Sequence, residues 1–95
     1  MNAKEVVEKI KANRDSIKKY GVKRLGLFGS YSRGDANPKS DLDFVVEFEH
    51  KSFDAYMGLK QYLEELFNIT VDLVLIDSIK PRLRSQILKE IVDAA

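Results

Sequence analysis

The chain has 95 residues, enough for one domain spanning residues 1–95 with one hydrophobic core and too few for a second. Its 44% apolar and 33% charged residues are typical of a globular protein, and a formal net charge of +1 disfavours nucleic-acid binding by general phosphate neutralisation. The absence of cysteine excludes disulfides and thiolate metal sites. No apolar run approaches the ~20 residues that span a bilayer, and the first residues lack a signal-peptide core, so we expect a cytoplasmic protein without membrane contact.

The first third of the chain predicts a helix, a strand and a tight turn. Helical spacing of apolar residues predicts a helix over residues 3–19, which Gly21 ends. Residues 22–28 are typical of a strand. Gly29 and Ser30 form a turn, and Ser30 is a candidate cap for a short helix that ends near Arg33. A loop follows, from residue 34 to about 38.

The rest of the chain predicts two strands that alternate with two helices. Residues 42–48 alternate between an apolar face and a face that carries acids, as in a strand with one buried side. A helix begins at Ser52 or Asp54, and a strand over residues 69–76 contains Asp72. Pro81 suits the first turn of a last helix. The expected buried residues of the two helices are Phe53, Tyr56, Met57, Leu63, Leu66 and Phe67 in the first, and Leu83, Ile87, Leu88 and Ile91 in the second.

This order of elements predicts an α/β (α+β) fold: a small mixed β-sheet flanked by helices. The connection from residues 42–48 to residues 69–76 contains a helix, which permits a parallel pairing without requiring it. We expect the helices to pack on one side of the sheet and to leave the acidic face free.

Two aspartates on the second strand point to a metal site. Asp41 and Asp43 are two residues apart, so both side chains lie on one face of the strand, where they repel each other unless a cation lies between them. Mg²⁺ takes oxygen ligands and usually binds through one or two carboxylates and substrate phosphates. Asp72 interrupts an apolar strand and is the candidate third ligand. Three carboxylates and a triphosphate can hold two metal ions about 3.5–4 Å apart.

The turn at Gly29 and Ser30 suits a phosphate. Glycine allows backbone to approach a phosphate closely, and the Ser30 hydroxyl can donate to a phosphate oxygen. Arg33 lies one turn further on, where it can pair with phosphate or brace the acidic loop. Each feature alone is ordinary, and only their combination is specific. Elsewhere we expect Tyr31 at the surface or facing a partner. Arg82 and Arg84 are expected at a solvated helix start, with phosphate contact as the alternative.

The motifs GSYSRG, SDLDF and VDLV together resemble the minimal nucleotidyltransferases of the DNA polymerase beta-like superfamily. Gly29 and Ser30 match the glycine and serine of that family's motif, Asp41 and Asp43 its paired acids, and Asp72 its third acid. The segment KPRLRSQILKEI is similar to the family's last helix, so the resemblance covers essentially the whole chain. It implies the nucleotidyltransferase fold, with nucleoside triphosphate and Mg²⁺ (two ions) as ligands.

Within that superfamily, the chain resembles the antitoxins of HEPN/MNT toxin–antitoxin modules. That resemblance implies a transferase that moves AMP from ATP to a hydroxyl, with tyrosine the expected acceptor, of a HEPN-type toxin. Asp41 and Asp43 would then hold both metal ions, Asp72 would join the ion on the acceptor side, and Gly29, Ser30 and Arg33 would bind the nucleotide. The alternatives are an antitoxin that acts by contact alone, or a transferase for a small molecule or an RNA end. A partner protein or a second copy of the chain is expected to complete the shallow nucleotide pocket.

Overall fold

The computed structural model describes residues 2–34, 36–37 and 40–94. None of the helices in these ranges combines the length and the apolar character needed to cross a membrane. The elements in chain order are α1 (Ala3–Ala12), α2 (Arg14–Lys18), β1 (Val22–Phe28), α3 (Ser30–Arg33), β2 (Leu42–Phe48), α4 (Phe53–Phe67), β3 (Val71–Leu75), the 3₁₀ turn η1 (Ile76–Ser78), α5 (Pro81–Glu90) and β4 (Val92–Asp93).

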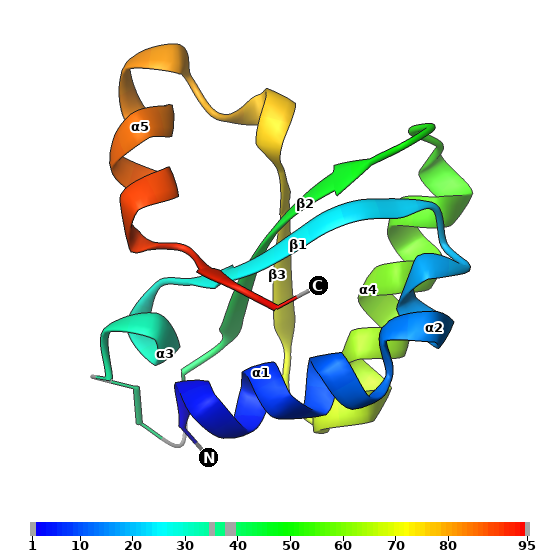
Figure 1. Ribbon diagram of the computed structural model, residues 1–95, viewed down its shortest axis with the longest axis horizontal. Coiled ribbons are helices and arrows are strands. Elements are labelled where there is room, and N and C mark those ends of the chain that lie inside the picture. Colours follow the sequence, from blue (N-terminus) through cyan, green and yellow to red (C-terminus); the bar gives the residue numbers. More distant parts are fainter. Residues whose placement is uncertain (1, 35, 38–39, 95) are drawn as a thin grey trace.

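A mixed four-stranded sheet of order β3-β2-β1-β4 forms the centre of the molecule (Figure 1). β1 is antiparallel to β2 and to β4, whereas β2 and β3 are parallel. The parallel pair is joined through α4, as a crossover connection requires. The expected mixed sheet with flanking helices is confirmed, and β4 adds a fourth strand of two residues, too short for its sequence pattern to indicate.

The hydrophobic core lies between one face of this sheet and α1, α2 and α4. Leu42, Phe44 and Val46 of β2 are all buried on that face, as the alternation of the strand predicts. Phe44 packs against Phe67 of α4, with ring centroids 6.2 Å apart. The buried residues of α1 and α2 are Val6, Ile10 and Ile17. The alternating pattern of β2 therefore orients the acids of the strand toward the opposite face.

The helix predicted over residues 3–19 is divided at Asn13. The side-chain amide of Asn13 donates to the carbonyl of Lys9 at 2.8 Å, and its backbone N–H donates to the carbonyl of Ile10 at 3.1 Å. These local bonds replace the regular helical pattern, a competition that asparagine favours. The chain then reaches the turn at Gly21, whose φ of +82° allows it to enter β1.

α4 buries most of the predicted residues, with Leu63 and Phe67 in the core and Tyr56 and Leu66 packed against it, but two of the six are exposed. Ser52 caps the helix by accepting a hydrogen bond from the N–H of Ala55 at 3.0 Å. Leu59 and Leu63 are fully buried, whereas Phe53 is 77% exposed and Met57 is 43% exposed. The prediction that Phe53 and Met57 belong to the core is therefore wrong. Both residues lie away from the helix face that holds Leu59, because successive residues turn by about 100°.

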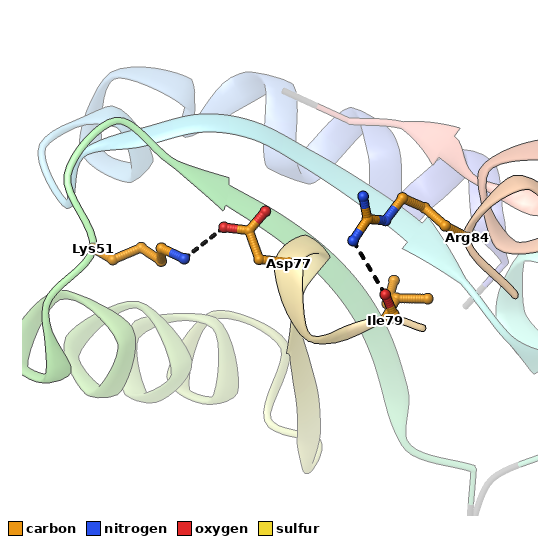
Figure 2. Close-up of polar contacts among 4 residues, drawn as sticks. All are labelled: Lys51, Asp77, Ile79 and Arg84. Atoms are coloured by element: carbon orange, nitrogen blue, oxygen red, sulfur yellow. Dashed lines mark hydrogen bonds and ion pairs between the residues drawn. The ribbon is translucent and has the colours of Figure 1, made fainter. Parts of the chain in front are cut away.

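The C-terminal third also departs from the prediction. β3 ends at Leu75 and continues into η1, and Pro81 is at the start of α5, as expected. Leu83, expected to be buried, is 43% exposed. Arg84, expected to be solvated, is instead half-buried and donates from its guanidinium to the carbonyl of Ile79 at 3.2 Å (Figure 2). This bond ties α5 to the segment that leads into it.

α5 lies on the opposite side of the sheet from α1, α2 and α4 (Figure 1). Leu88 and Ile91 line a small cavity with Gly26 of β1 and Val45 of β2, both on the acidic face. A Cβ on Gly26 would lie 2.2 Å from Cγ2 of Ile91, so the missing side chain of Gly26 makes room for the end of α5. The expectation that helices leave the whole acidic face free is thus wrong: α5 covers its middle.

Candidate active site

Two adjacent strands, β2 and β3, bring the candidate acids to one part of the sheet. Asp43 of β2 is the direct partner of Phe28 in β1 and of Asp72 in β3. Directly paired residues point to the same face of a sheet, so the side chains of Asp43 and Asp72 are neighbours although the residues are 29 positions apart in the sequence (72 − 43). Asp41 precedes β2 by one residue and is two residues from Asp43. Asp41 and Asp72 are exposed, while Asp43 between them is half-buried.

The environment of Asp43 disfavours its charged form. Burial is the main cause that raises the pKa of this carboxyl above its ordinary value of 3.8. The negative charges of Asp72 and then Asp41 raise the pKa further, and the positive charge of Arg33 opposes them. This direction of the pKa shift follows from the position of Asp43, which is partly buried and lies near two other carboxylates.

Gly29 forms the wall of this site next to Asp43. Its φ of +76° lies in a region that residues with a side chain rarely adopt. A Cβ on Gly29 would lie 2.2 Å from Oδ2 of Asp43 and 3.0 Å from Cγ. Both the backbone conformation and the packing therefore require glycine, and the turn holds its backbone directly against the carboxylate.

The short helix α3 extends from this turn. Ser30 is its first residue, half-buried, and Arg33 is its last, exposed. The carbonyl of Gly29 accepts hydrogen bonds from Ser32 Oγ at 2.8 Å and from the N–H of Arg33 at 3.2 Å. α3 thus places Arg33 where its charge acts on Asp43. Tyr31, expected at the surface, is instead buried at 6% exposure.

The donor set fits a hard divalent cation. Asp41, Asp43 and Asp72 offer only oxygen ligands, and their mutual repulsion falls when a cation lies between them. Mg²⁺ usually completes its shell with phosphate oxygens and water. Among the described residues, no three His, Cys, Asp or Glu side chains are by themselves arranged to hold a metal ion.

Two residues of the site were not singled out from the sequence. Phe28 lies directly beside Asp43, on the side away from Asp72. Side chains alternate along a strand, so Phe28, which follows the buried Leu27, could have been placed on the acidic face from the sequence. Ser32 accounts for one of the two hydrogen bonds to the Gly29 carbonyl. A serine three residues after a turn residue is a common signal for such a bond.

Residues 7–94 match a family model described as a nucleotidyltransferase domain. The chain therefore belongs to the nucleotidyltransferase domain family, and the resemblance seen in its motifs is confirmed. Within that family it is similar to the protein adenylyltransferase MntA of Thermococcus cleftensis. The two are 35% identical over 94 residues, which cover 97% of this chain and 95% of the relative.

Two solved structures share the fold and contain toxin–antitoxin complexes. One is a toxin–antitoxin with AMP-PNP, in which a chain is 25% identical with a TM-score of 0.71, covering 90% of this chain and 72% of the other. The second is a tri-AMPylated HEPN toxin of Shewanella oneidensis in complex with an MNT antitoxin. There the identity is 25% and the TM-score 0.59, with 90% and 71% of the two chains covered.

Proposed function

We propose that this chain is a Mg²⁺-dependent protein adenylyltransferase that transfers AMP from ATP to a tyrosine hydroxyl of a HEPN-type toxin and acts as its antitoxin. The observation that carries the proposal is the pairing of Asp43 with Asp72 across two parallel strands, with Gly29 against Asp43. The family supports nucleotidyl transfer. Similarity to a protein adenylyltransferase, to a toxin–antitoxin complex with AMP-PNP and to a complex with an AMPylated HEPN toxin supports the protein acceptor, the nucleotide and the toxin.

In this proposal the three aspartates bind metal, and the turn after β1 binds the nucleotide. Asp41 and Asp43 would hold the cation or cations, and Asp72 would join the cation that serves the acceptor hydroxyl. When bound, Mg²⁺ neutralises charge on the phosphates and lowers the pKa of an acceptor hydroxyl. The backbone at Gly29 and the hydroxyl of Ser30 bind the triphosphate, because N–H groups at a helix start lack an intrahelical acceptor. Arg33 offsets negative charge beside Asp43.

The proposed transfer is a single displacement at the α-phosphorus of ATP. The tyrosine oxygen attacks the α-phosphorus of ATP and forms a phosphodiester bond to AMP. The bond between that phosphorus and the α,β-bridging oxygen breaks, and pyrophosphate leaves with the electron pair. The proton of the hydroxyl is released to solvent. Asp41, Asp43 and Asp72 contribute by fixing the orientation of the triphosphate relative to the attacking oxygen.

The exposure of the acids supports a macromolecular acceptor. Asp41 and Asp72 lie on an open part of the sheet face, next to the region that α5 covers. A partner protein that docks there would exclude water from the site and present a tyrosine, which the chain itself has no need to supply. In this arrangement the chain binds the nucleotide and the partner supplies the acceptor, so a small domain suffices for a specific transfer.

The test is incorporation of label from ATP. The full chain, Mg²⁺ and a HEPN-type toxin from the same genome are incubated with ATP labelled in the α-phosphate, and in parallel with ATP labelled in the γ-phosphate. We expect stable labelling of the toxin from the first nucleotide alone. Asp41→Asn combined with Asp43→Asn should lower the rate roughly 100-fold or more. Replacing the acceptor tyrosine of the toxin with phenylalanine should abolish labelling.

Other outcomes would select the alternatives. Equal labelling by the double variant would exclude Asp41 and Asp43 from the reaction. If the double variant does not label the toxin but still neutralises it, the chain is an antitoxin that acts by contact. If no protein is labelled and pyrophosphate is released only when a small molecule or an RNA end is added, the acceptor is that molecule and not a protein.

A further inference from the structure

β3, the strand that carries Asp72, lies at the edge of the sheet. Of the strands in the described residues, only β2 pairs with it. The carbonyl of Thr70, just before β3, accepts a hydrogen bond from the N–H of Leu42 at 3.0 Å. Because backbone groups alternate in direction along a strand, those of Val71 and Leu73 point outward, away from β2. The outer side of the backbone around Asp72 is thus held by no strand of the described residues.

Two side chains of α4 bond to these outward groups. The carboxylate of Glu64 accepts a hydrogen bond from the N–H of Val71 at 3.0 Å, and the hydroxyl of Tyr56 donates to the carbonyl of Leu73 at 2.6 Å. Both bonds are partly buried, which strengthens them relative to bonds in water. α4 thus takes the place of a neighbouring strand.

The two bonds lie on either side of Asp72. The side chains of Val71 and Leu73 are buried in the core, at 1% and 3% exposure, which fixes how deeply β3 lies. Core packing acts from one face only, so it does not prevent the strand from tilting about its own axis. The hydrogen bonds from α4 act in the plane of the sheet and oppose that tilt. A tilt would move the Asp72 carboxylate relative to its strand partner Asp43.

We propose that Tyr56 and Glu64 are positioning residues that fix the Asp72 carboxylate through the backbone of β3. They act on the backbone and not on substrate, because α4 packs on the core face of the sheet whereas Asp72 lies on the acidic face. This role rests on the proposed function, in which Asp72 joins the cation that serves the acceptor hydroxyl. Loss of either bond should therefore weaken cation binding and lower kcat. The KM for ATP, set at the turn after β1, should change little.

Removal of a single hydroxyl tests the bond to Leu73. Tyr56→Phe removes the donor, and Tyr62→Phe is the matched control on the same helix, because the Tyr62 hydroxyl donates instead to Asn13 Oδ1 at 3.3 Å. Binding of Mn²⁺, a probe for the Mg²⁺ site, is measured by calorimetry on the full chain in the presence of AMP-PNP. We expect binding about 3- to 10-fold weaker in Tyr56→Phe and unchanged in Tyr62→Phe. Circular dichroism checks that both variants fold.

Substitutions at Glu64 separate its hydrogen bond from its charge. Glu64→Gln keeps an oxygen that can accept from Val71, whereas Glu64→Ala does not. Lys60→Ala removes only the ion pair between Lys60 and Glu64, whose charged atoms are 3.7 Å apart. Hydrogen exchange of the Val71 N–H should accelerate about tenfold in Glu64→Ala and stay near the wild-type rate in the other two variants. Mn²⁺ binding should follow the same order.

A double-mutant cycle tests whether the effect of Tyr56 passes through Asp72. In an Asp72→Asn background, Tyr56→Phe should no longer weaken Mn²⁺ binding, because the ligand that Tyr56 positions has been replaced. A general loss of stability would instead weaken binding by the same factor in both backgrounds. With a HEPN-type toxin as acceptor, Tyr56→Phe should lower kcat about 3- to 10-fold and leave the KM for ATP within about twofold of the wild type.

The proposal is wrong if Tyr56→Phe binds Mn²⁺ as the wild type does, if Tyr62→Phe loses as much, or if the effect of Tyr56→Phe persists in the Asp72→Asn background. A higher average mass of Tyr56→Phe in sedimentation, with Mn²⁺ binding unchanged, would also overturn it. The two bonds would then only shield the edge of β3 from another strand. Failure of the wild-type chain to label a toxin would contradict the proposed function, and the Mn²⁺ and exchange measurements would still decide the role of Tyr56 and Glu64.

Discussion

The backbone of Gly29 lies directly against the carboxylate of Asp43, so closely that a Cβ on Gly29 would come within 2.2 Å of Oδ2. This contact joins the phosphate-binding turn proposed for β1 to the proposed metal ligand on β2. Because Asp43 is also the direct strand partner of Asp72, a displacement at Gly29 moves the acid that lies next to both the turn and the third candidate ligand.

Gly29→Ala should therefore harm both stability and transfer. The added methyl group meets Asp43, and the φ of +76° strains any residue with a side chain. We expect a cost of about 1–3 kcal/mol in the free energy of unfolding and a large loss of ATP-dependent labelling. Gly21→Ala is the matched control, because its φ is +82° and nothing lies within 4 Å of the added Cβ. It should lose stability from strain alone and keep its activity. Equal activity of the two variants would contradict the role of the contact.

Asp43→Asn should stabilise the protein while it removes activity. The pKa of Asp43 is raised in the folded state, so between 3.8 and that raised value the native state binds more protons than the unfolded state. Its contribution to stability is thus present at low pH and is lost as pH rises through the folded pKa. We expect a higher Tm than the wild type at pH 7, with the difference disappearing below about pH 4. Thermal unfolding across this range measures it, and a variant less stable at pH 7 would refute it.

Asp72→Asn should lower the pKa of Asp43. Among the neighbouring charges, that of Asp72 is the largest that raises this pKa, because the two residues are direct partners in the parallel pair. Carboxyl ¹³C chemical shifts followed through an acid titration report the pKa of Asp43 directly. Glu47→Gln is the control, since Glu47 is on the same strand face but is absent from the causes of the shift. An unchanged titration of Asp43 in Asp72→Asn would mean that the two carboxylates do not interact.

Gly26→Ala should loosen α5 and β4 from the sheet. Its Cβ would lie 2.2 Å from Ile91 Cγ2, and overpacking of this kind costs about 1–3 kcal/mol. Hydrogen exchange of the Ala94 N–H, which donates to the carbonyl of Leu25 at 2.9 Å, should accelerate. Ile91→Ala removes the atom that clashes, so the double variant should recover part of the loss. A double-mutant cycle without coupling would show that the contact is unimportant.

Local patterns in the sequence predicted much of the fold. The alternation of β2 correctly separated the buried Phe44 from Asp43, because successive side chains of a strand point to opposite faces. The bounds of β1 and β2 and the end of α3 were also predicted correctly, whereas Ser30, the predicted cap, is the first residue of α3 and Gly29 caps the helix without a side-chain bond. The exposure of Phe53 and Met57 was not predicted, because α4 carries apolar residues on more than one face and only the surfaces packed against it decide which of them are covered.

By itself, the sequence determined which groups are available for chemistry: three aspartates, a Gly-Ser turn, and the strand that carries Asp43. Only the tertiary structure decided which of these groups meet. Strand register depends on contacts between residues far apart in the chain, and that register pairs Asp43 with Asp72. The same long-range packing places α5 over the middle of the acidic face and leaves Phe53 in solvent. Residue types are local properties, whereas proximity and exposure are properties of the whole fold.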